Sequence, residues 1–64
     1  MITKSENREI SKLTQWREAG FADAGLLARS LSALIRAART NRSAAYIRAL
    51  AEEWGVTSHP EFIA

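Results

Sequence analysis

Arginine is the residue in this sequence whose type and spacing are best suited to a chemical role. The segment from residue 24 to residue 51 contains no Asp or Glu, and it carries five arginines: Arg29, Arg36, Arg39, Arg42 and Arg48. A guanidinium group presents a planar set of N–H donors that matches phosphate or carboxylate oxygens, and it stays charged at physiological pH. The segment therefore predicts a surface that binds an anionic partner, and a nucleic-acid backbone is the first candidate.

Helical spacing predicts how these arginines would be used. Arg29, Arg36 and Arg39 should form a row along one helix face, and Ser32 should share that face. The start of the next helix would add backbone N–H groups to the phosphate site. Arg48 is a weaker ligand because Glu52 lies four residues further on and could pair with it. The candidate nucleic-acid-binding residues are Arg29, Arg36, Arg39, Asn41, Arg42, Ser43 and Arg48.

The sequence has few residues that could form a metal site, a catalytic carboxylate pair or a phosphate-binding loop. His59 is the only histidine and there is no cysteine, so we expect no metal centre, and we interpret His59 as exposed and without a function. Glu52 and Glu53 are adjacent and would point about 100° apart on a helix, which is poor geometry for a catalytic carboxylate pair. The glycines are isolated and form no phosphate-cradling loop. We therefore expect no enzyme activity, no cofactor and no small-molecule substrate.

Three helices must position the arginines. Thr3 and Glu6 have the spacing of a capping box, and Asp23 is a good N-cap for a second helix. Gly20 and Gly55 are natural residues to follow a helix end. No segment has the two-residue alternation of a strand. The sequence predicts an all-α, compact three-helix bundle with helices at about 4–18, 24–39 and 43–54, a short C-terminal tail and one domain over 1–64.

The second and third helices are expected to be separate because their apolar stripes would otherwise lie on nearly opposite sides of one long helix. Thr40, Asn41 and Ser43 can form local hydrogen bonds that end a helix and cap a new one. The alternative is a continuous helix, which would give an elongated helical hairpin dimer. A separate pair joined at 40–42 would resemble a helix-turn-helix, in which 41–43 would reach the bases.

Aromatic residues are expected to supply much of the core, because the alanines in the helices contribute little apolar area. We expect Trp16, Phe21, Tyr46 and Trp54 to pack inward together with the leucines, and Phe21 to staple the entry to the second helix. The alternative for Trp16 and Tyr46 is an exposed ring that stacks on bases or anchors a protein partner. After Gly55, three apolar residues could fold back on the bundle, or the segment could form a loose tail: Val56, Phe62 and Ile63.

Composition sets the broader context. The chain has 64 residues, 47% of them apolar, and a formal net charge of +2. It has neither the apolar stretch of a secretory signal nor that of a membrane span, so we expect a cytoplasmic protein that does not bind a membrane. A chain this short has a thin core, which favours association as a homodimer. Two functions remain open: a regulator that binds nucleic acid, DNA rather than RNA, or a protein-binding module such as an inhibitor, adaptor or antitoxin-like subunit that docks an acidic partner.

Overall fold

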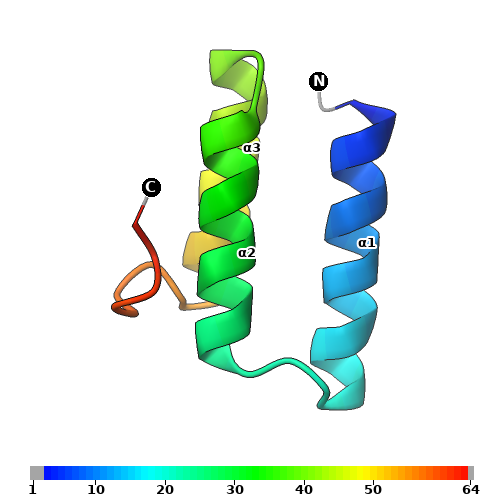
Figure 1. Ribbon diagram of the computed structural model, residues 1–64, viewed down its shortest axis with the longest axis vertical. Coiled ribbons are helices and arrows are strands. Elements are labelled where there is room, and N and C mark those ends of the chain that lie inside the picture. Colours follow the sequence, from blue (N-terminus) through cyan, green and yellow to red (C-terminus); the bar gives the residue numbers. More distant parts are fainter. Residues whose placement is uncertain (1–2, 64) are drawn as a thin grey trace.

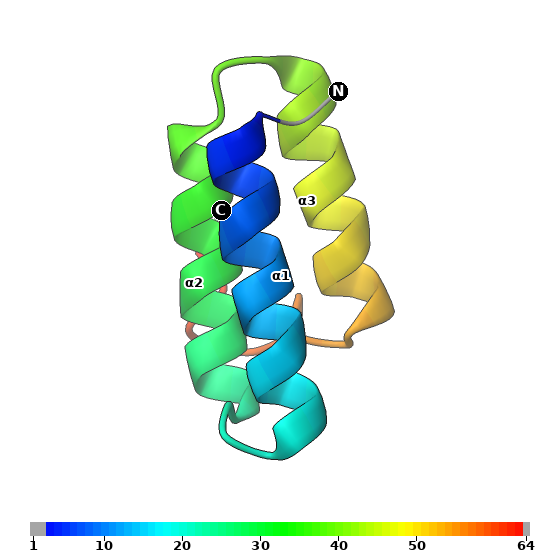
Figure 2. The same ribbon diagram turned by 90° about the vertical axis from the view of Figure 1, so that its right-hand side faces the viewer.

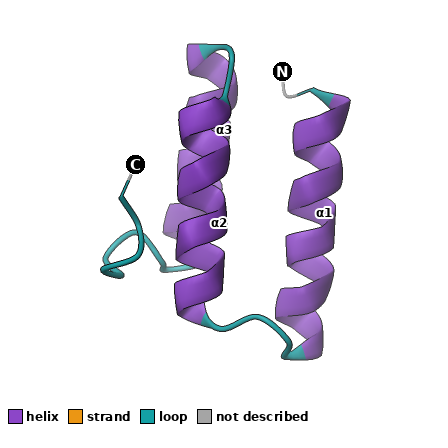
Figure 3. Ribbon diagram, viewed as in Figure 1, coloured by secondary structure: helices purple, strands orange, loops and turns teal. Residues whose placement is uncertain are grey.

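The computed structural model describes residues 3–63 and places three α-helices in them. They are α1 (Lys4–Ala19), α2 (Ala24–Ala37) and α3 (Asn41–Glu53). Helices α2 and α3 run antiparallel and side by side, and α1 lies along them as the third helix of the bundle (Figures 1 and 2). The rest of the described chain is loop and turn (Figure 3). The prediction of an all-α three-helix bundle is confirmed.

The first two helices start where their capping residues predict. The Thr3 hydroxyl accepts a hydrogen bond from the Glu6 amide at 3.1 Å, and the Glu6 carboxylate accepts one from the Thr3 amide at 2.9 Å. This is a complete capping box, and it satisfies amides that a helix start leaves without partners. The Asp23 carboxylate accepts from the Leu26 amide at 2.8 Å and caps α2 in the same way.

Left-handed glycines follow α1 and α3. Gly20 has φ +81° and Gly55 has φ +74°, conformations that cost other residues free energy because of their Cβ atom. The amide of Gly20 donates to the Arg17 carbonyl, and the amide of Gly55 donates to the Glu52 carbonyl. Both helices therefore end within one residue of the prediction. Helix α1 ends one residue later than expected, and α3 ends one residue earlier.

The reversal between α2 and α3, residues 38–40, differs in detail from the prediction. The two helices are separate, as expected, so the continuous-helix alternative is wrong. However, α2 ends at Ala37, two residues before the predicted end, because Ala38 has extended backbone (φ −63°, ψ 136°). Helix α3 begins two residues early because Thr40 is its N-cap, and the Thr40 hydroxyl accepts from the Ser43 amide at 3.0 Å.

The core is aliphatic. Ala28, Leu31, Ile47 and Ala51 have no exposed surface, and the small alanine side chains let α2 and α3 approach each other closely. Helix α1 contributes buried residues near its middle, and the segment after α3 adds one more. The buried apolar residues are Ile10, Leu13, Leu27, Ala28, Leu31, Ile35, Ile47, Ala51 and Val56.

The expected aromatic core is wrong for three of the four aromatic residues. Phe21 is 79% exposed, Tyr46 is 52% exposed and Trp16 is 40% exposed. Trp54 is half-buried, and the Arg17 guanidinium lies 5.1 Å from the centre of its ring, which ties α1 to the end of α3. Phe21 cannot staple α2, because the residue directly before the Asp23 cap is Ala22, and it is Ala22 that packs against the core.

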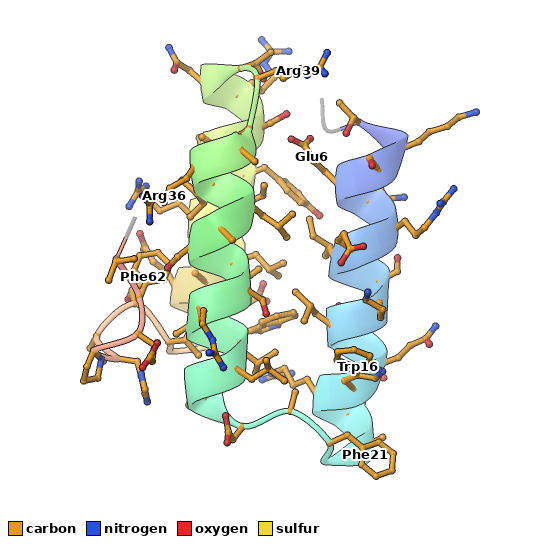
Figure 4. The ribbon with its side chains drawn as sticks, in the orientation of Figure 1. Glu6, Trp16, Phe21, Arg36, Arg39 and Phe62 are labelled. Carbon is orange, nitrogen blue, oxygen red and sulfur yellow. The ribbon has the colours of Figure 1, made fainter. Side chains whose placement is uncertain are left out.

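The segment after α3, residues 56–63, folds back over α2 rather than forming a loose tail (Figures 1 and 4). Val56 is buried and Phe62 packs against the core, whereas Ile63 is 66% exposed. The Ile63 amide donates to the Ser32 hydroxyl at 3.0 Å, and that hydroxyl donates to the Ala28 carbonyl at 2.8 Å. This segment therefore covers Ser32, which the sequence pattern placed on an exposed polar face.

We predict that Leu31→Ala lowers the free energy of unfolding by about 2–5 kcal/mol, because it removes fully buried methyl groups and leaves a cavity. The measurement is urea unfolding followed by circular dichroism. Phe21→Ala is the control and should change stability by less than about 0.5 kcal/mol, because Phe21 is exposed. An equal loss in both variants would contradict this core.

We predict that Ser32→Ala lowers stability by about 1 kcal/mol, because it removes the acceptor that holds the Ile63 amide. Hydrogen exchange of the Ile63 amide should become faster, while exchange in the α2 and α3 cores stays slow. Ser58→Ala, in an exposed part of the same segment, is the matched control and should leave the Ile63 amide unchanged. Unchanged Ile63 exchange in Ser32→Ala would show that this hydrogen bond does not hold the segment.

Candidate nucleic-acid interface

Three of the predicted arginines gather at one end of the bundle. Arg36 lies in the last turn of α2, Arg39 lies in the reversal and Arg42 is the second residue of α3. All three side chains are exposed. Because α2 ends and α3 starts at the same end of the molecule (Figure 1), we call Arg36, Arg39 and Arg42 the basic end.

The predicted arginine row along α2 is wrong. Arg39 lies beyond the last residue of α2, and it points to a different side of the molecule from Arg36 (Figure 4). Arg29 and Arg36 share a helix face, two turns apart, but Ser32 between them is buried under residues 56–63. The early end of α2 and the folded-back segment both break the row.

The other candidates are dispersed. Asn41 is exposed at the first position of α3 and adjoins the basic end. Ser43 is only 2% exposed, so it cannot contact a nucleic acid; it is buried because it occupies the third position of α3, on the face that packs inward. Arg48 is exposed midway along α3, away from the reversal.

The arrangement of α2 and α3 is also not that of a helix-turn-helix. In that motif two helices cross at roughly 90–120°, so that the second can enter the major groove while the first lies across it. Here α2 and α3 run antiparallel from the short reversal that joins them and do not cross (Figures 1 and 2). The motif-like interpretation of 40–42 is therefore wrong: the reversal forms a helical hairpin.

The guanidinium groups of the basic end form no salt bridge within the described chain. Arg36, Arg39 and Arg42 make no ion pair within 4 Å to any residue of 3–63. Arg39 lines a hollow that Glu6 and Glu9 also line, and the Glu6 carboxylate accepts the capping-box hydrogen bond. Arg29 likewise lines a hollow with two acidic residues, Asp23 and Glu61, near the start of α2.

Acidic side chains gather at the opposite end of the bundle. Helix α1 ends there, α2 begins there and α3 ends there (Figure 1). We call the following exposed residues the acidic end: Glu18, Asp23, Glu52, Glu53 and Glu61. The sequence shows these acids only as flanks of the arginine-rich segment; the antiparallel helices bring the two flanks together.

His59 has a structural contact that the sequence did not predict. Its Nδ1 accepts a hydrogen bond from the Glu61 amide at 3.1 Å. Its ring packs over Gly25, where an added Cβ would lie 3.4 Å from Cε1. The exposed, unused histidine of the sequence interpretation is therefore half-buried against α2. Within residues 3–63, no three His, Cys, Asp or Glu side chains come together as a metal site.

A groove between α1 and α2 was missed by sequence reasoning. It consists of two hollows of about 410 and 420 Å³ that share Glu9, Leu34 and Ala37 in their walls. Ser30, Ala33 and Ala37 form its α2 side, and Lys12 and Trp16 form much of its α1 side. We call this surface the α1–α2 groove. The available signal was the run of small residues at positions 30, 33 and 37 of α2, one helical turn apart.

No helix within residues 3–63 combines the length and the apolar character needed to cross a bilayer. Comparison with known proteins finds no family model that matches the chain, and neither a curated protein nor a solved structure matches it significantly. Its geometry and charge are therefore the basis for assigning a function.

Proposed function

We propose that this chain is a small cytoplasmic regulatory protein that binds nucleic acid, DNA in preference to RNA, through phosphate contacts at the basic end. One observation carries the proposal: Arg36, Arg39 and Arg42 are exposed around one reversal and have no ion-pair partner within residues 3–63. An arginine without a carboxylate partner keeps its donors available for phosphate oxygens. Although Arg36 and Arg39 point to different sides, the three charges lie around one reversal and give a local positive charge that the net charge of +2 does not reveal.

The start of α3 supports the same kind of contact. The positive end of the helix macrodipole lies at Asn41 and Arg42, and it favours a bound anion. The far end of α3 carries Glu52 and Glu53, which repel phosphate. A duplex would therefore touch the end of the bundle rather than lie along α3. Contacts of this kind recognise the backbone and carry little base information.

A second function is supported by a different observation. Trp16 is 40% exposed beside the α1–α2 groove, and an exposed aromatic next to a groove is typical of protein-binding sites. In this alternative the chain is an adaptor, inhibitor or antitoxin-like subunit. Its basic end would then meet carboxylates of an acidic protein partner instead of phosphates.

We predict that the wild-type protein binds a generic labelled DNA duplex in fluorescence anisotropy. The logarithm of the association constant should fall with the logarithm of the salt concentration at a slope of about −3. Each of three phosphates neutralised by Arg36, Arg39 and Arg42 contributes about 0.9 to that slope. Arg39→Gln and Arg42→Gln should each weaken binding to all sequences alike and should each reduce the slope by about 1. A matched RNA duplex measures the preference for DNA.

The control is Arg29→Gln, which removes the same charge at a position away from the basic end. It should change the affinity and the slope much less than the other two variants. An equal effect of all three would show diffuse attraction and overturn the assignment to the basic end. No binding at low salt would reject nucleic acid and favour the acidic protein partner.

A further inference from the structure

We propose that the α1–α2 groove is the interface of an antiparallel homodimer, in which the basic end of each copy lies against the acidic end of the other. The occupant of the groove is thus a second copy of this chain. The groove runs along the side of the bundle and reaches the basic end, because Arg39 lines one of its two hollows, so a dimer and a duplex would compete for that residue.

The first support is apolar surface that the monomer leaves uncovered. Trp16 is 40% exposed, Ala33 and Ala37 are exposed, and Leu34 is half-buried beside them. The small side chains on α2 let another helix approach closely, and Trp16 offers a large ring at one end of the groove, where Figure 4 shows it on the lower part of α1. Association would remove this area from water, which is favourable.

The second support is charge complementarity, and it selects a second copy. Basic residues predominate at one end of the molecule, where Glu6 also lies, and acidic residues predominate at the other, where Arg17 and Arg29 also lie. An antiparallel pair places opposite ends together, whereas a parallel pair places like charges together. The groove itself carries both signs, since Lys12 and Glu9 form an exposed salt bridge of 3.2 Å at its wall. A surface with both signs can be complementary to itself, as a two-fold interface requires.

The third support is size. The described chain has principal extents of 29 × 22 × 16 Å, and α1 and α2 lie side by side on the broad face that Figure 1 presents. That face is of the same order as the ~800 Å² that each partner contributes to a standard protein interface. A chain this small also gains from a partner, because its own core buries a limited fraction of its surface.

We predict a monomer–dimer equilibrium for the wild type in sedimentation equilibrium over the micromolar to millimolar range. Ala33→Glu places a charge in the middle of the groove and should make the protein monomeric throughout that range. The matched control is Ala49→Glu, which makes the same change at an exposed alanine on the outer side of α3 and should leave the dimer intact. Circular dichroism checks that both variants keep the helical fold.

Salt tests the antiparallel orientation. If opposite ends face each other, the dimer should weaken as salt rises from low to physiological concentration, because salt screens the attraction between them. A dimer that strengthens over this range would have like ends together and would overturn the orientation. A wild type that stays monomeric, or an equal loss in Ala33→Glu and Ala49→Glu, would overturn the interface itself. Ala33→Glu keeps Arg36, Arg39 and Arg42, so duplex binding by this monomeric variant tests the proposed function separately from the dimer.

Discussion

The reversal at 38–40 is the constraint on which the rest of the structure depends. Extended backbone at Ala38 ends α2, and the Thr40 cap starts α3 within the same short stretch. This turns α3 back so that Ile47 and Ala51 meet Leu31 on α2 and form the buried centre of the bundle. The same turn collects three arginines at one end and brings the acidic flanks together at the other.

The helices could be predicted from the sequence because their boundaries are set by local chemistry. A hydroxyl or carboxylate three residues ahead of a free amide, as at Thr3 and Asp23, forms the same cap in almost any fold. The end of α2 was harder to predict from the sequence, because neither Ala38 nor Arg39 is a residue type that ends a helix. That two-residue difference decided the candidate site: it removed Arg39 from the face of Arg36, so the predicted row became three arginines spread around the reversal.

Burial was harder to predict than helicity. Side-chain size suggested that Trp16, Phe21 and Tyr46 belong inside, yet aliphatic residues and fully buried alanines fill the core. A thin bundle with closely spaced helices has little room for large rings, so these rings lie at the margins. Ser32 shows the converse: it sits on a polar helix face in the sequence pattern, but contact with a segment thirty-one residues away buries it. The residues next to Ser32 in the sequence give no sign of a contact with so distant a segment.

The folded-back segment implies an order of events during folding. The contacts between α2 and α3 join residues close in sequence, so this hairpin requires only a short loop to close. The hydrogen bond from the Ile63 amide to Ser32 spans 31 residues, and its donor, which follows α3, comes within reach of Ser32 on α2 only when α2 and α3 are already paired. Residues 56–63 should therefore dock last. For the same reason they should be the first part of the described chain to detach, so the bundle has a fast local opening that is distinct from global unfolding.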